Sequence, residues 1–192
     1  PTAGWSNLPL AGAPTANPWD LQERKFADGT AGMVLSSFPR GEPLTGTLRS
    51  AAFPAPSRFS FWMCGHDGYP DKPVQGLNGA RLRDASTGAV LASAPPPRDD
   101  TARRVDWDLS AHTGKPVVFE VTDADTAGAY AWIAVARFEP AVVKLPTVGL
   151  RAATERRAAA ADLAARLGLK EQEAMLRSAA LDRVQDPDVR LA

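Results

Sequence analysis

The sequence predicts a mainly β protein, an antiparallel β-sandwich or jelly roll with a C-terminal helical hairpin. From about residue 21 to residue 140, short apolar stretches alternate with turn signals, which is the pattern of a sandwich. Several of these stretches alternate apolar and polar residues with a period of two, as half-buried strands do. After Pro146 the prolines and glycines nearly disappear, and Ala, Leu, Arg and Glu, which favour helices, dominate.

This change in composition predicts three segments. Residues 1–20 are turn-rich and are expected to form an irregular strap that packs Trp5 and Trp19 onto the body. Residues 21–146 form the sandwich domain. Residues 147–192 form a helical extension whose apolar stripe is too narrow for a core of its own. It therefore packs on the edge of the sandwich or begins an array of helical repeats.

Eight strands are expected in the sandwich. Their predicted ranges are 32–38, 46–53, 57–65, 78–85, 89–94, 103–110, 116–124 and 130–140. In the third strand, Phe59, Phe61 and Met63 are predicted to share the core face. Two turns follow from glycines that supply a positive φ, Gly88 in "DASTGAV" and Gly114 in "LSAHTGKPV".

The bulk composition excludes several classes of protein. Lys+Arg and Asp+Glu both total 22, so the formal net charge is zero, which argues against a general nucleic-acid binder. The sequence contains no run of about 18 apolar residues, so no membrane span is predicted. The single cysteine excludes an internal disulfide and an all-cysteine metal site, and without a C-x-x-C-H motif no c-type haem attaches in this segment.

The stretch "FWMCGHDGYPDK" at 61–72 combines residues that elsewhere form metal or catalytic sites. A catalytic Cys–His pair needs a third group that orients the base, and the neighbouring sequence offers no such partner for His66. Cys64 is therefore expected to pack as a small hydrophobic residue. His66 and Asp67 either stabilise the turn that follows or contact a ligand.

A second polar cluster, "VTDADTAGAYAWIAV", follows a predicted strand. Asp123 and Asp125 could bind calcium, as could Asp28 in the loop "ADGTAG", or Asp123 could simply cap backbone amides in a solvated turn. Tyr130 and Trp132 are expected to share one strand face. There they would stack on a sugar if exposed and belong to the core if buried, and the core is favoured for Trp132.

The charged positions of two other strands leave a choice open. Asp106 and Asp108 are expected to lie on a solvated face opposite a buried Trp107, and they indicate a glycosidase only if they flank a cleft. Arg81 and Arg83 either clamp an anionic group or form cross-strand salt bridges with aspartates. The sequence contains no G-x-S-x-G, H-E-x-x-H or G-x-G-x-x-G motif, and no enzyme is predicted.

Four segments together resemble a β-sandwich of the galactose-binding-domain-like type: "GEPLTGTLRSAAF", "RFSFWMCGHDG", "ARLRDASTGAVL" and "VDWDLSAHTGKPVVFEVTDADTAGAYAWIAVARF". Similar segments occur in large exported multidomain proteins of the Planctomycetes–Verrucomicrobia group, together with HEAT-like helical repeats and c-type cytochrome domains. The resemblance covers roughly residues 17–140. It implies an extracellular or periplasmic, non-catalytic module that binds carbohydrate through loops at one end of the sandwich and sometimes carries a structural calcium ion.

The predicted function is accordingly that of a carbohydrate-binding module within a larger exported protein. Its partners would be a polysaccharide or oligosaccharide and the neighbouring domains of the same polypeptide. The loops at 65–78 and 123–131 are expected to hold the ligand through His66, Asp67, Tyr69, Asn78, Arg81, Asp123, Tyr130 and Trp132. The possible calcium ligands are Asp28, Asp123 and Asp125. The alternative is a structural or interaction module that docks neighbouring domains and takes no small ligand.

Overall fold

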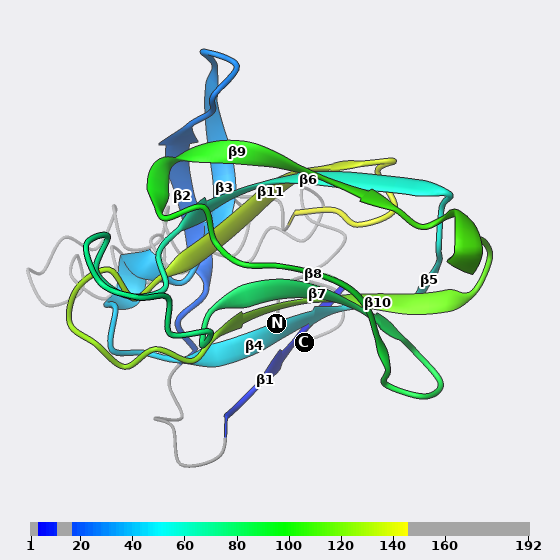
Figure 1. Ribbon diagram of the computed structural model, residues 1–192, viewed down its shortest axis with the longest axis horizontal. Helices are drawn as coiled ribbons and strands as arrows, with labels where there is room; N and C mark the ends of the chain where they lie inside the picture. The colour runs from blue at the N-terminus through cyan, green and yellow to red at the C-terminus, as the bar shows by residue number, and fades with distance from the viewer. Residues whose placement is uncertain (1–3, 11–16, 146–192) are drawn as a thin grey trace, which may run out of the picture. The chain divides into compact units, whose positions relative to one another are not determined.

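A computed structural model describes residues 4–10 and 17–145 and confirms a mainly β sandwich of two antiparallel sheets (Figure 1). The first sheet has the order β1 (Trp5–Leu8), β4 (Gly46–Ser50), β10 (Pro116–Asp123), β7 (Gly79–Asp84) and β8 (Val90–Ala94), with the short β5 (Phe53–Pro54) beside β10. The second sheet has the order β2 (Asp20–Lys25), β3 (Ala31–Ser36), β11 (Ile133–Glu139), β6 (Arg58–Gly65) and β9 (Asp99–Asp108). Two short 3₁₀ helices complete the described elements, η1 (Phe38–Arg40) and η2 (Ser110–His112).

The chain divides into two units, Pro1–Pro146 and Thr147–Ala192. The predicted helical hairpin falls entirely in the second unit and so lies outside the described residues. In the described part of the chain, no helix has the length and the apolar composition needed to cross a membrane.

Two strands were not predicted from the sequence. Residues 5–8, expected in an irregular strap, form β1, which pairs with β4 in the register Trp5↔Ser50. Its four residues are too few for a periodic signal, and the neighbouring β4 supplies the pairing. β2, "DLQERK", contains only one apolar residue, but it is an edge strand that pairs along its whole length with β3.

Aromatic rings from both sheets fill the space between them. Phe59, Phe61 and Met63 of β6 are at most 1% exposed, which confirms the predicted core face. Phe119 of β10 packs edge-on against Phe61, with ring centroids 5.0 Å apart. Trp5 belongs to the same cluster, and its indole N–H donates to the Lys144 carbonyl over 2.8 Å.

The second sheet also carries a smaller apolar cluster, formed by Phe26, Val34, Cys64, Ala102, Trp132, Ala134 and Ala136. Along β6, Cys64 alternates with the core residue Met63 and therefore lies on the opposite face of the sheet. An isolated bridge between Phe26 and Ala102 joins the end of β2 to β9. This bridge brings the two outer strands of the second sheet together, and the smaller apolar cluster is buried on the outward face of that sheet.

Candidate functional site

A hollow of about 260 Å³ lies at the end of the sandwich where two long loops meet η1. The loops are 66–78, between β6 and β7, and 124–132, between β10 and β11, at the left of Figure 1. The hollow is lined by Gln22, Arg24, Phe38, Glu42, His66, Asp100, Ala129, Tyr130 and Trp132. Three of these nine, His66, Tyr130 and Trp132, were predicted as ligand-binding residues.

Gly65 determines how the first loop leaves β6. Its φ of 121° lies in a region that side chains rarely adopt. The next residue, His66, donates its backbone N–H to the Trp132 carbonyl over 2.7 Å, and Gly68 donates to the Tyr130 carbonyl over 3.0 Å. The two loops are therefore joined through their backbones directly beneath the hollow.

Asp67 and Asn78 hold the loops from inside. Asp67 is 0% exposed and accepts the backbone N–H groups of residues 76–78 over 2.5–3.0 Å. The Asn78 amide donates to the His66 carbonyl over 2.9 Å and accepts the backbone N–H of Ala124 over 2.8 Å. Both were predicted to contact a ligand, but their polar atoms are used within the protein.

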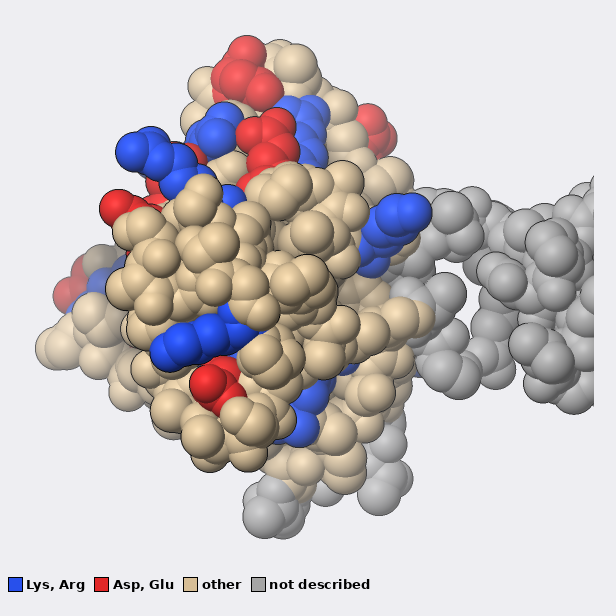
Figure 2. All heavy atoms as spheres, turned by 90° about the vertical axis from the view of Figure 1, so that its right-hand side faces the viewer, with Lys and Arg blue, Asp and Glu red and all other residues tan. Residues whose placement is uncertain are grey.

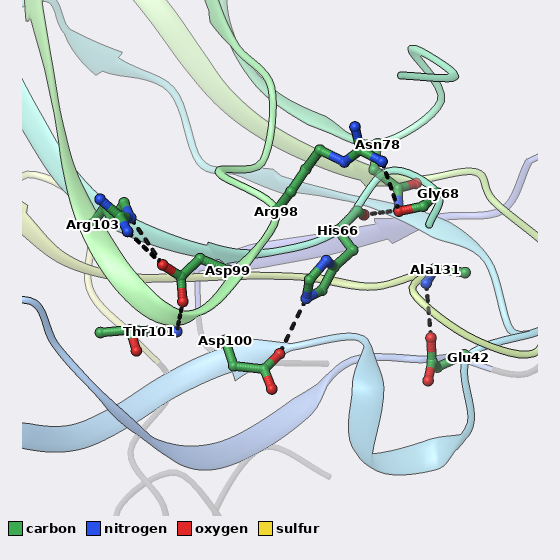
Figure 3. Close-up of polar contacts among 10 residues, drawn as sticks. All are labelled: Glu42, His66, Gly68, Asn78, Arg98, Asp99, Asp100, Thr101, Arg103 and Ala131. Atoms are coloured by element: carbon green, nitrogen blue, oxygen red, sulfur yellow. Dashed lines mark hydrogen bonds and ion pairs between the residues drawn. The ribbon is translucent and has the colours of Figure 1, made fainter. Parts of the chain in front are cut away.

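His66 is also buried, at 5% exposure, and has a partner that local sequence did not suggest. Its Nε2 lies 3.2 Å from Oδ1 of Asp100, at the start of β9 (Figure 3). The imidazole meets the Tyr130 ring edge-on, with centroids 4.9 Å apart. His66 thus orients Tyr130 and Asp100 at the wall of the hollow.

Two tyrosines form the exposed aromatic surface of this end. Tyr69 is 47% exposed and Tyr130 is 40% exposed, and their centroids lie 5.1 Å apart at an interplanar angle of 50°. Tyr130 has a φ of 57° and precedes β11, which begins at Ile133. The prediction that Tyr130 and Trp132 share a strand face is therefore wrong. Trp132 is only 3% exposed, as favoured.

Arg98 holds the loop that carries Tyr69. Its Nη2 donates to the carbonyl oxygens of Gly68 (3.4 Å), Tyr69 and Lys72 (2.8 Å), and Figure 3 shows the contact with Gly68. Three carbonyls of one turn thus converge on one guanidinium from the β8–β9 connection. This role of Arg98 was not predicted from the sequence.

Four polar lining residues were also missed: Gln22, Arg24, Glu42 and Asp100. They come from β2, the segment after η1 and β9, far from the predicted loops in the sequence. Gln22 Oε1 and Arg24 Nε are buried and have no hydrogen-bond partner. Glu42 Oε2 accepts the backbone N–H of Ala131 over 2.7 Å (Figure 3). The only local feature that could have indicated their role was the two-residue spacing of Gln22 and Arg24, which places both side chains on one face of a short polar strand.

Asp123 is an unusual carboxyl group at the end of β10. It is 0% exposed, its Oδ1 accepts the Asp125 N–H over 3.3 Å, and its Oδ2 has no partner. Burial raises the pKa of Asp123 to about 8, although the nearby Ser37 hydroxyl and the Asp125 N–H act in the opposite direction. Asp123 is consequently protonated at neutral pH and does not offer a free carboxylate to a ligand.

The three carboxylates predicted as calcium ligands do not come together. Asp28 lies in the β2–β3 turn, where it accepts Arg137 Nη1 over 2.8 Å. Asp125 accepts the Ala127 N–H over 3.0 Å and Gln75 Nε2 over 3.1 Å. In the described ranges, no three His, Cys, Asp or Glu side chains form a metal-binding group. These donors do not fit calcium, which takes six to eight oxygens.

Arg81 lies away from the hollow. It belongs to β7 in the first sheet, opposite Glu120 of β10. Its neighbour Arg83 donates Nε to Oε2 of the buried Glu120 over 2.5 Å, and Arg49 donates to Oε1 over 2.7 Å. The expected cross-strand pairing therefore occurs with a glutamate, not with an aspartate.

Cys64 packs in the smaller apolar cluster and is 0% exposed, as predicted. Burial raises the pKa of its thiol to about 12, so the thiolate needed for nucleophilic attack is scarce at neutral pH.

A larger hollow, of about 470 Å³, lies at the opposite end of the second sheet, where β6 begins and β9 ends. Its charges are mostly paired: Arg104 Nε lies 3.0 Å from Asp106 and its Nη2 3.2 Å from Glu139. Trp107 is only 9% exposed there, while Asp106 is solvated as predicted. Figure 2 faces the right-hand side of Figure 1 and shows acidic and basic side chains interspersed. This hollow offers neither a partnerless buried polar atom nor an exposed ring among the described residues.

No family model matches the chain, and no curated protein matches it. Among solved structures, it is similar to the K2 cleaved adhesin domain of Lys-gingipain from Porphyromonas gingivalis (14% identity, 71% of this chain and 88% of that chain, TM-score 0.46). It is also similar to the C-terminal extracellular domain of Mycobacterium tuberculosis EmbC (18%, 76% and 56%, TM-score 0.41). A third is the C-terminal CBM6 of LamC, a marine laminarinase from Zobellia galactanivorans (12%, 69% and 99%, TM-score 0.32). All three TM-scores are below 0.5, so the function of this chain has to be inferred from its own geometry.

Proposed function

We propose that this chain is a non-catalytic carbohydrate-binding module that takes one sugar ring of a polysaccharide or oligosaccharide into the hollow. The observation that carries the proposal is the lining of the hollow, where the exposed ring of Tyr130 stands beside Gln22, Glu42 and Asp100. A pyranose has an apolar face that suits an aromatic ring and a rim of hydroxyls that suits planar amide and carboxylate groups.

The size of the hollow agrees with a ligand that enters in part. About 260 Å³ is less than the roughly 300–1,000 Å³ of a pocket that encloses a drug-sized ligand. Tyr69, held by Arg98, lies just outside the hollow beside Tyr130 and gives a neighbouring sugar a second contact. The resemblance of the sequence to modules of exported multidomain proteins supports a place in such a protein.

The test is retention of the wild-type chain on a glycan array and in polysaccharide-containing native gels. We expect retention on at least one glycan and about a fivefold loss of affinity in Tyr130→Ala, since one aromatic contact is worth about 1 kcal/mol. Val90→Ala is the matched control, because Val90 is an exposed apolar residue of β8 outside the hollow. No retention on any glycan, or unchanged affinity in Tyr130→Ala, would contradict the proposal.

One observation favours a second function, the docking of a neighbouring domain. The loop 66–78 exposes Val74 (57%) and Leu77 (38%) in addition to Tyr69, and exposed apolar side chains gathered in one place often mark an interaction site. Val74→Ser together with Leu77→Ser should then weaken binding to an adjacent domain of the parent protein, measured calorimetrically. Under the carbohydrate proposal, the same double variant keeps its retention on glycans.

A further inference from the structure

Two arginines cover aromatic rings on the outward face of the second sheet, and they are held very differently. Arg137 of β11 places Cζ 3.5 Å from the Phe26 centroid. Its guanidinium is fixed there, because Nη1 donates to Asp28 over 2.8 Å and Nη2 donates to Thr30 over 2.7 Å. Arg137 is thus an anchored cover of the apolar cluster.

Arg24 of β2 covers Trp132 without such an anchor. Its Cζ lies 4.3 Å from the Trp132 centroid and 5.2 Å from the Phe38 centroid. Within the described residues, its guanidinium takes part in no hydrogen bond or ion pair, and its Nε is buried without a partner. Glu42 and Asp100 line the same hollow, but they accept from Ala131 and contact His66 instead.

The energies indicate that this cover is weakly held. A cation–π contact is attractive, and more so when it is desolvated. A buried donor without a partner carries a desolvation cost of similar size, which offsets most of that attraction. Phe38 and His66 also pack against Trp132, but Arg24 is the cover of the Trp132 ring that can leave at little cost.

We propose that Arg24 is a displaceable cover, and that a sugar ring entering the hollow moves its guanidinium aside and stacks on Trp132. This inference rests on the proposed function and adds a second aromatic contact to it. Arg24 and Trp132 both line the hollow, so we expect the ring of Trp132 to open onto it once the guanidinium leaves. Trp132 was predicted either to belong to the core or to stack on a ligand. With a displaceable cover, Trp132 is buried beneath Arg24 in the free protein and stacks on the sugar in the complex.

The first measurement needs no glycan. Trp132 emission is isolated by subtracting the spectrum of a Trp132→Phe partner variant, and its quenching by acrylamide is compared among wild type, Arg24→Ala and Arg137→Ala. We expect at least a twofold rise in quenching for Arg24→Ala and none for Arg137→Ala, whose ring partners are Phe26 and Trp62. Urea unfolding confirms that each variant is folded.

The second measurement uses the glycan that wild type retains most strongly. Arg24→Ala should bind it roughly two- to fivefold more tightly, because the ligand no longer competes with the guanidinium. If Arg24→Ala shows the same quenching as wild type, or binds the glycan equally well, Arg24 is not a displaceable cover. If Arg24→Ala binds the glycan more weakly, the proposal is also overturned, and Arg24 is instead a ligand contact. If wild type binds no glycan while quenching rises, the carbohydrate proposal fails and the loosely held cover itself stands.

Discussion

Buried polar side chains, not exposed ones, build the loop end of this sandwich. Asp67, Asn78 and Asp123 are each at most 3% exposed, and the first two satisfy backbone groups of both loops. A buried polar group is costly unless it is hydrogen-bonded, so such residues more often hold loops in place than bind ligands. Asp123 departs from this rule, since one of its oxygens has no partner.

Asp123 should make the stability of the protein depend on pH. Its pKa is about 8 in the folded state and near 3.8 in the unfolded state, so the folded state holds the extra proton between these values. The contribution of Asp123 to the free energy of unfolding should therefore be highest below about pH 4. Between about pH 4 and about pH 8 it should fall by as much as about 1.4 kcal/mol per pH unit.

Urea unfolding at pH 5 to 9 checks this expectation. Asp123→Asn removes the titrating group, so its stability should vary less with pH and exceed that of wild type above pH 8. Asp71→Asn is the control, because the Asp71 side chain is 73% exposed and its removal should leave the slope unchanged. Equal slopes in wild type and Asp123→Asn would contradict the role of Asp123.

At the scale of elements, the site depends on where β6 and β11 end. β6 stops at Gly65, whose backbone conformation sends the chain towards Asp67, and β11 starts only at Ile133. Tyr130 and Trp132 therefore lie in a loop, where side chains do not have to alternate between two faces as they do in a strand. β2 adds the opposite wall, since Gln22 and Arg24 point from this edge strand into the hollow.

Gly65→Ala should damage this end of the sandwich severely. An added Cβ would lie 2.7 Å from the Ile133 Cα and closer still to the Trp132 carbonyl oxygen, and both are backbone atoms that cannot move independently. Together with the positive φ, this should lower the free energy of unfolding by about 3 kcal/mol or more. Urea unfolding measures the loss.

The control is Gly88→Ala in the β7–β8 turn, where φ is also positive, at 73°, but no atom lies within 4 Å of the added Cβ. It should lose only about 1–2 kcal/mol. If both substitutions lowered the free energy of unfolding by similar amounts, the close approach of the backbone at Gly65 would not contribute to stability.

At the scale of the whole sandwich, aromatic contacts between the sheets supply the cohesion. Phe119 is the main aromatic contribution of β10, and its centroid lies 5.0 Å from that of Phe61 and 5.2 Å from that of Phe138, both in the second sheet. It is 0% exposed. A single ring thus joins a central strand of one sheet to two strands of the other.

Phe119→Ala should reduce the free energy of unfolding by about 3–5 kcal/mol, the range for loss of a buried phenylalanine. Chemical unfolding followed by fluorescence and by circular dichroism should give coincident transitions at a lower midpoint. Val90→Ala, at a position 48% exposed, should change stability by less than about 1 kcal/mol. A loss below about 1 kcal/mol for Phe119→Ala would contradict a shared core.

Local sequence patterns were enough to predict the sandwich, most of its strands, the core face of β6 and the burial of Cys64, because period-two alternation and glycine turns are local signals. They also indicated which two loops would meet. Which polar residues face inward could not be predicted in this way, because a side chain such as His66 has its partner Asp100 34 residues away in the sequence. β2, which carries Gln22 and Arg24 to the hollow, has almost no apolar pattern of its own. It becomes a strand because β3 pairs with it, and a wall of the candidate site because the second sheet curls towards β9.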